Sequence, residues 1–237
     1  MPEGEQANTE AEPVRFALSD RQRVAWLRLW RTDNVGPATF RDLINHCGSA
    51  ENALAMLPTL ATRGGRQRHP HIPSEADAEA ELAAIARHGA RLIGIGEPDY
   101  PPLLRLSDQA PPLVTVKGDA AVLGRPCVAI VGSRNASMAG LTMARRLAAG
   151  LGEAGHTVAS GLARGIDAAA HEAALDAGTI AVLAGGPDRP YPPENVPLLE
   201  RIEAGPGCSI TEKPFGWQPR SKDFPRRNRI IAGLSVA

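Results

Sequence analysis

The sequence predicts an α/β protein in which a small all-helical domain precedes a Rossmann-like, doubly wound and mostly parallel sheet. Two observations predict this class. Helical spacing dominates between residues 18 and 60, whereas six short apolar runs follow residue 90. Helical patterns with one apolar face separate the last four runs. Strands with few polar residues that alternate with such helices are typical of a parallel sheet covered on both faces.

Composition divides the 237 residues into four segments. Residues 1–15 are polar and contain Pro and Gly, so a disordered tail is expected there. Residues 16–61 form the helical domain, and residues 62–73 form a basic linker interrupted by Gly and Pro. Residues 74–237 form the α/β domain. Two folded units agree with a chain of this length.

The helical domain contains two clear helical patterns. Ser19 is expected to cap the first helix, and the second follows the turn "NVGPATF". The apolar residues recur at helical spacing: Val24, Leu27, Trp30, Phe40, Leu43 and Ile44. The turn at Gly36 and Pro37 is hairpin-like and can direct helix N-terminal amides at DNA phosphates, as helix-hairpin-helix motifs do. Only Arg41 lies close by, so we favour a connector role for this turn.

The α/β domain begins with an Ala- and Glu-rich helix from Ser74 to His88. The expected strands are "RLIGI", "PLVTV", "CVAIV", "HTVAS", "TIAVLA" and "CSITE". Helices are expected at "LTMARRLAAGLGEAG", "IDAAAHEAALDAG" and "VPLLERIEAG". The second of these should have Asp167 as its N-cap and end at Gly178. The first should bury one face, formed by Ala144, Leu147, Ala148 and Leu151.

Glycine-rich loops follow the strands of the predicted parallel sheet, where ligands of such sheets bind. The loops begin "GSRNASMAG", "SGLARGID", "GGPDRPYPPEN" and "EKPFG". Neither G-x-G-x-x-G nor G-x-x-x-x-G-K-[ST] is present, so no dinucleotide or triphosphate cofactor is expected. Arg134 offers a planar fork for a phosphate, and Ser133 adds a hydroxyl donor. The alternative is a plain tight turn with a solvated arginine.

A basic segment, "SKDFPRRNRIIAGLS", covers residues 221–235. Phe224 stands between Lys222 and Arg226, and a helix should open with Arg227, Asn228 and Arg229 in its first turn. Cations at a helix N-terminus oppose its dipole, so this arrangement favours a phosphate chain with a base stacked on Phe224. The alternative is a solvated run of charge, with Ile230, Ile231 and Leu234 as a buried face.

We expect a binding protein and no catalytic site. Asp167 and His171 lie four residues apart on a predicted helix, but a cap and a packed or surface histidine explain them better than acid–base catalysis. "DRPYPPEN" is expected to be a rigid loop. Cys47, Cys127 and Cys208 lack metal-ligand spacing and should be reduced thiols, so no metal is expected.

Charge and hydropathy exclude several classes of protein. There are 26 basic and 26 acidic residues, so any polyanion partner must be bound by a local basic surface. The N-terminus is acidic where a secretory signal would be basic, and no apolar run approaches the roughly 20 residues that span a bilayer. We therefore expect a cytoplasmic protein with no membrane partner.

Four motifs in this order closely resemble the DprA/Smf DNA-processing family: "VAIVGSRNAS", "SGLARGIDAAAHEAAL", "TIAVLAGGPDRPYPPEN" and "FPRRNRIIAGLS". The helical domain resembles, more weakly, the sterile-alpha-motif-like N-terminal domain of that family. The resemblance implies a protein of natural transformation that binds and protects single-stranded DNA and loads the RecA recombinase. It also implies a homodimer without catalytic turnover.

The resemblance also implies a DNA-binding site, carried over residue by residue. It comprises Gly132, Ser133, Arg134, Gly161, Ala163, Arg164, Lys222, Phe224, Arg227 and Asn228. Family members continue beyond the point at which this sequence stops, and Val236 and Ala237 would begin a strand. We therefore expect the α/β domain to be truncated at its C-terminal end, with an incomplete dimer interface and RecA contact.

Two other functions remain open at this stage. A nucleotide phosphoribohydrolase of the Rossmann-like "lonely guy" type would share the sheet topology. That family carries P-G-G-x-G-T-x-x-E, whereas "GGPDRP" here has neither the Thr nor the Glu at the required spacing. The third hypothesis makes the helical domain a protein-interaction adaptor and the sheet its scaffold, with no affinity for oligonucleotides.

Overall fold

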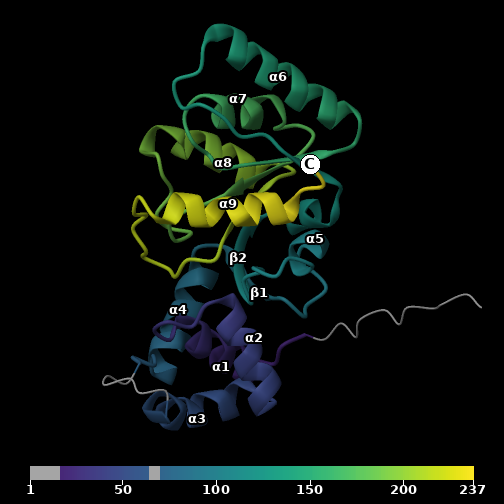
Figure 1. Ribbon diagram of the computed structural model, residues 1–237. Helices are drawn as coiled ribbons and strands as arrows, with labels where there is room; N and C mark the ends of the chain where they lie inside the picture. Colours follow the sequence, from purple (N-terminus) through teal and green to yellow (C-terminus); the bar gives the residue numbers. More distant parts are fainter. Residues whose placement is uncertain (1–16, 64–69) are drawn as a thin grey trace, which may run out of the picture.

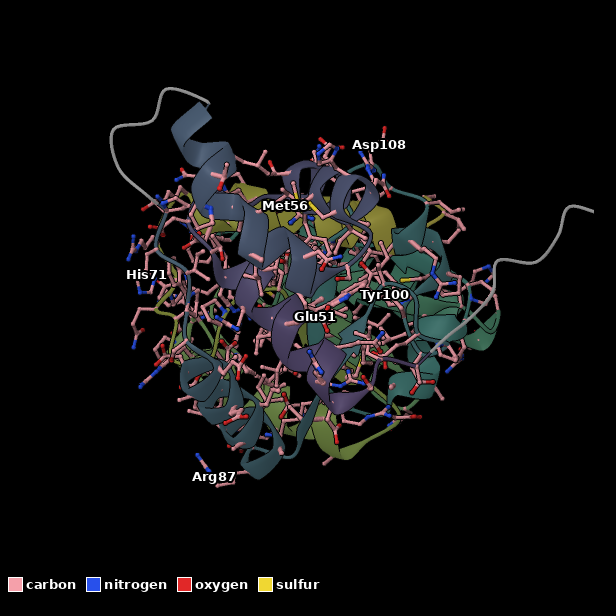
Figure 2. All side chains as sticks on the ribbon, turned by 90° about the horizontal axis from the view of Figure 1, so that it is seen from below. Glu51, Met56, His71, Arg87, Tyr100 and Asp108 are labelled. Carbon is pink, nitrogen blue, oxygen red and sulfur yellow. The ribbon has the colours of Figure 1, made fainter. Side chains whose placement is uncertain are left out.

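The structure, a computed structural model, describes residues 17–63 and 70–237 (Figure 1). The predicted tail at 1–15 lies outside the described residues, as do residues 64–69 of the predicted linker at 62–73. Residues 62 and 63 still belong to a helix, so the linker begins later than predicted. Figure 1 shows the helices between residues 20 and 87 at one end of the molecule and the sheet with its covering helices at the other. Figure 2 views the molecule from the helical end, with Glu51 near the centre of the view.

The helical domain follows the sequence prediction closely. Its elements are α1 (Asp20–Arg31), α2 (Pro37–Cys47) and α3 (Ala50–Arg63). Ser19 is the N-cap of α1, where its hydroxyl accepts from the Gln22 main chain in a capping box. The core of this domain includes Phe40, against which two tryptophan rings, Trp26 and Trp30, pack edge-on at 5.1 and 6.3 Å between centroids.

Helix α4 (Glu75–Arg87) connects the helical domain to the sheet. It packs against both α1 and the first strand, and its Ile85 is buried in a cluster with Leu27 of α1. Arg31 of α1 forms an ion pair of 2.8 Å with Glu81 and donates a hydrogen bond of 3.0 Å to the carbonyl of Glu212. The two domains therefore share apolar core and polar contacts.

All six predicted strands are present in one mixed, mostly parallel sheet. The strands are β1 (Ala90–Gly94), β2 (Leu113–Gly118), β3 (Cys127–Ala129), β4 (Thr157–Ser160), β5 (Thr179–Val182) and β6 (Cys208–Thr211). Their spatial order is β1-β2-β6-β5-β4-β3. Strands β3 to β6 are parallel, and β1 and β2 extend the sheet in antiparallel fashion.

Helices cover both faces of the sheet. The remaining elements are α5 (Pro102–Arg105), α6 (Met138–Glu153), α7 (Ile166–Ala173), α8 (Val196–Ala204), α9 (Asp223–Leu234) and two short 3-10 helices, Ala120–Gly124 and Pro193–Asn195. Ile180 of β5 packs in a core that includes the predicted buried face of α9, while Ala181 packs against α8 on the other face. This alternation confirms the doubly covered sheet.

The last two residues pair with the edge of the sheet. The main-chain N–H of Val236 donates to the carbonyl of Cys127 at 2.9 Å, and that of Ala129 donates to Ala237 at 2.8 Å. Helix α9 thus returns the chain from β6 to β3. The predicted start of a strand at this point is confirmed in its hydrogen bonding.

The predicted buried face of α6 is wrong at one position, because Leu147 is 53% exposed. Ala144 and Ala148 face the sheet and are buried, so small side chains set the approach of this helix. Leu147 lies on the opposite flank from Arg145, which pairs with Glu172 of α7. That flank points away from α7, which leaves the Leu147 side chain about half exposed.

Candidate functional site

A cavity of about 190 Å³ lies at the carboxyl ends of the parallel strands. It is formed by the loops that follow β3, β4 and β5 and by the start of α9. Its lining residues are Arg134, Asn135, Gly161, Ala163, Arg164, Tyr191, Pro192 and Phe224. Five of these eight belong to the site predicted from the sequence, so the fold brings together loops that are up to 90 residues apart, from position 134 to position 224.

Arg134 and Phe224 meet in this cavity. The guanidinium carbon of Arg134 lies 5.3 Å from the centroid of the Phe224 ring, within the range of a cation–π contact. Ser133 and Arg134 are exposed, and the Ser133 hydroxyl accepts from the main chain of Asn135 at 3.2 Å. A Cβ at Gly132 would come within 2.7 Å of the Ile166 side chain. The loop after β3 therefore needs glycine to reach the start of α7.

Arg227 was predicted to be a DNA-binding cation in the first turn of a helix, but it is buried and lies beyond the first turn of α9. Its side chain is only 6% exposed, and its Nη1 donates hydrogen bonds to the carbonyl oxygens of Gly161, at 2.6 Å, and of Val182. Burial, aided by the nearby charge of Arg134, lowers the pKa of Arg227 to about 10, so the group remains charged at neutral pH. Arg227 thus supports the loop of Gly161 from behind.

Asp167 also holds the loops, and its prediction as an N-cap is wrong. The N-cap of α7 is Gly165, at φ +75°, where a Cβ would collide with the carbonyl of Ser133. Asp167 lies in the first turn, and its carboxylate accepts from the main-chain N–H of Gly132 at 3.3 Å and of Gly161 at 3.1 Å. One buried carboxylate therefore links the loops after β3 and β4.

Helix α7 is shorter than predicted, since it ends at Ala173 and not at Gly178. His171 on this helix is fully buried, and its Nδ1 lies 2.8 Å from the hydroxyl of Thr179. That hydroxyl donates to the carbonyl of Val158, so Nδ1 must be the donor to Thr179. Burial lowers the pKa of His171 to about 3. A neutral, packed histidine agrees with the structural role expected for it.

Helix α9 begins at Asp223, four residues before Arg227, where the sequence analysis placed the start of its first turn. Asp223 stands in its first turn, fully buried, and accepts from Lys213 Nζ at 2.9 Å and from Trp217 Nε1 at 3.0 Å. Burial raises the pKa of this carboxyl, but the hydrogen bonds from Lys213 and Trp217 outweigh that effect and leave it lowered. The argument from cations opposing the helix dipole is therefore wrong, because an acidic residue occupies the first turn.

The remaining predicted residues lie around the cavity. Arg164 forms an exposed ion pair with Glu194, and Lys222 and Asn228 are exposed near Phe224. The Asn228 side-chain oxygen accepts from Arg227 Nε at 3.2 Å. The loops can thus present two free cationic side chains, Arg134 and Lys222, beside one aromatic ring. Such a surface can bind a phosphate chain and stack a base.

The sequence analysis missed Tyr191. Its ring is 47% exposed and lies edge-on to Phe224, with centroids 5.5 Å apart and planes at 64°. Tyr191 occurs in the loop after β5, at the edge of the sheet where ligands bind, and this position was the available signal. The loop was predicted to be rigid without a role, because its many prolines dominated its interpretation. Asn135 and Pro192 were missed as well.

Among residues 17–63 and 70–237, no three His, Cys, Asp or Glu side chains come together as metal ligands would. Over those same ranges, no helix is long and apolar enough to traverse a lipid bilayer.

Comparisons with known proteins show the family of this chain. Residues 91–237 match the model of the family described as DNA recombination-mediator protein A, and residues 20–84 match that of the DprA-like N-terminal HHH domain. Protein Smf of Synechocystis sp. is 34% identical over 93% of this chain and 58% of its own length. The DNA processing protein DprA of Bacillus subtilis is 37% identical over 65% of this chain and 52% of its own length. The chain thus spans about half the length of these curated relatives.

Two solved structures share the fold. DNA processing protein A of Streptococcus pneumoniae superposes with a TM-score of 0.63 at 32% identity, covering 85% of this chain and 65% of that one. DNA processing protein A of Helicobacter pylori, whose structure describes a single-stranded DNA binding mode, gives 0.57 at 26% identity over 62% of this chain and 66% of that one. With a family model matching residues 91–237, this chain belongs to the DprA/Smf family of DNA-processing proteins.

Proposed function

We propose that this chain binds single-stranded DNA in the cavity between Arg134 and Phe224. The observation that carries the proposal is the convergence of a free guanidinium and an aromatic ring, 5.3 Å apart, at the carboxyl edge of the sheet. The guanidinium suits a phosphate, and the ring suits an unpaired base. A base in a duplex is stacked on both sides and cannot reach the ring, so the geometry favours single strands.

The structure of the Helicobacter pylori protein with its single-stranded DNA binding mode supports this proposal. By the same family relationship, we infer that this protein is cytoplasmic, protects incoming DNA during natural transformation and loads RecA onto it. We also infer a homodimer. The role is binding without catalytic turnover, since the predicted site residues act through charge and stacking.

The nucleotide phosphoribohydrolase is the less favoured function. In the loop after β5, the first carboxylate is that of Asp188, which accepts from the main chain of Gly216 at 2.6 Å and pairs with Arg189 at 3.1 Å. That carboxylate is therefore engaged in holding two loops together. Release of free base from nucleoside monophosphates on incubation with the protein would reverse this ranking.

The direct test compares labelled single-stranded and double-stranded oligonucleotides of one sequence by fluorescence anisotropy. We expect the single strand to bind more tightly and its affinity to fall as salt rises, because phosphate contacts release counterions. Equal affinity for both forms, or no binding to either, contradicts the proposal. Sizing of the protein with and without DNA gives the number of subunits in each state.

A further inference from the structure

The carboxylate of Glu194 is paired with one of the cations of the proposed DNA site. It forms an ion pair with the guanidinium of Arg164, a residue that lines the cavity. The two side chains are 44% and 60% exposed, so solvent and ligands can reach both. A cation that a DNA phosphate would contact is therefore already paired with an anion of the protein itself.

The backbone fixes this carboxylate in place. Glu194 lies in the 3-10 helix Pro193–Asn195, whose first residue is a proline. The next residue, Asn195, donates from its side chain to the carbonyl of Leu162 at 2.9 Å, which ties this helix to the loop that carries Arg164. The position of Glu194 beside Arg164 is thus built into the loops and does not depend on the ion pair alone.

We propose that Glu194 holds the place of a DNA phosphate at Arg164, and that its carboxylate limits the affinity of the site for single-stranded DNA. This inference rests on the proposed function. A phosphate that approaches Arg164 must displace the carboxylate, which then remains nearby as an unpaired negative charge. Glu194 therefore selects for ligands with several phosphates, which can replace the ion pair while also binding Arg134.

The energetics of exposed ion pairs make this exchange feasible. Such pairs contribute little to stability, so their displacement by a phosphate is easily offset by other contacts. Hydrogen bonds from its own main-chain N–H and from Arg164 hold the pKa of the Glu194 carboxyl below its usual value. The carboxylate is thus charged at neutral pH, and it opposes a polyanion throughout the range in which DNA binding would be measured.

The test is the affinity of Glu194→Gln for a labelled single-stranded oligonucleotide. We expect roughly two- to fivefold tighter binding at about 50 mM salt and a smaller gain at about 300 mM, because exposed charges are screened. Glu194→Ala should show the same gain. The matched control is Glu172→Gln, which removes one equally exposed carboxylate from an ion pair with Arg145 on α6 and should leave the affinity unchanged.

Two results overturn the proposal. One is a gain for Glu194→Gln no larger than that for Glu172→Gln. The other is an undiminished gain in an Arg164→Ala background, which would make the effect a general charge repulsion and not occupation of Arg164. The variant Arg134→Ala distinguishes an error about Glu194 from an error about the DNA site as a whole. If Arg134→Ala weakens binding and Glu194→Gln does not strengthen it, only the role of Glu194 is wrong.

Discussion

The guanidinium of Arg227 donates a hydrogen bond of 2.6 Å to the carbonyl oxygen of Gly161. A Cβ at Gly161 would overlap this guanidinium, so the glycine leaves room for the arginine. The same nitrogen also donates to the carbonyl of Val182 at the end of β5. One buried cation thus joins α9 to two of the loops that form the cavity.

Removal of this cation should destabilise the fold. We expect Arg227→Ala to lower the free energy of unfolding by about 2–4 kcal/mol, because two buried carbonyl groups lose their donor. Urea denaturation followed by circular dichroism measures this change. The neighbouring Arg226→Ala should stay within about 0.5 kcal/mol, since Arg226 is exposed on the same helix. Equal stability of the two variants would show that the buried hydrogen bonds of Arg227 do not stabilise the fold.

The fold was largely predictable because the spacing of apolar residues along the sequence indicates most of its strands and helices. The six apolar runs and the helices between them occur where the sequence placed them, since parallel strands buried on both faces tolerate few polar residues. The rule that ligands bind at the carboxyl ends of strands predicted the position of the loop that carries Arg134. The placing of Phe224 in the same site came from the resemblance to the DprA/Smf family.

Errors arose where long-range contacts decide a position. Asp223 begins α9 a turn early because Lys213 and Trp217, ten and six residues upstream, donate hydrogen bonds to its buried carboxylate. Asp167 bonds to main-chain groups of two loops instead of capping its own helix. The burial of Arg227 depends on carbonyls 45 and 66 residues away. Helical propensity contains no information about such partners.

Arg134 and Phe224 give the central prediction about DNA binding. Phe224→Ala should weaken binding of a single-stranded oligonucleotide by about 1–3 kcal/mol, because one base loses its stacking partner. Arg134→Ala should weaken it about tenfold at low salt and reduce the salt slope by about 0.7, the value for one phosphate of a single strand. Anisotropy titrations at several salt concentrations measure both effects.

Arg146→Ala is the control for the arginine, because Arg146 is exposed on α6 and its loss removes the same charge. Its affinity should match that of the unmodified protein. A loss in Arg134→Ala that is independent of salt contradicts the phosphate contact. Unchanged binding in both Arg134→Ala and Phe224→Ala rejects the cavity as the DNA site.

Tyr191 should contribute to the same stacking surface. Its ring meets Phe224 edge-on at 5.5 Å, and both rings line the cavity, so they form one continuous aromatic surface against which a base can pack. Tyr191→Ala should weaken oligonucleotide binding by roughly five- to thirtyfold, within the range for loss of one stacking contact. Tyr191→Phe keeps the ring and should bind normally. Equal losses in both variants would assign the effect to the hydroxyl group and contradict the stacking role.

His171 makes the stability of the protein depend on pH. Burial lowers its pKa from 6.5 to about 3 in the folded protein, so between these values the unfolded chain binds a proton that the folded chain does not. The free energy of unfolding is therefore fully retained above about pH 6.5 and falls as the pH drops toward 3, by up to about 1.4 kcal/mol per pH unit. Urea midpoints measured from about pH 7 to about pH 5 should decrease accordingly, before most carboxyl groups titrate.

The control variant is His171→Asn, which can still donate to Thr179 but cannot be protonated. Its midpoint should change less over this range, because every other histidine contributes equally to both proteins. Parallel pH profiles for the two proteins would show that His171 is not the group responsible.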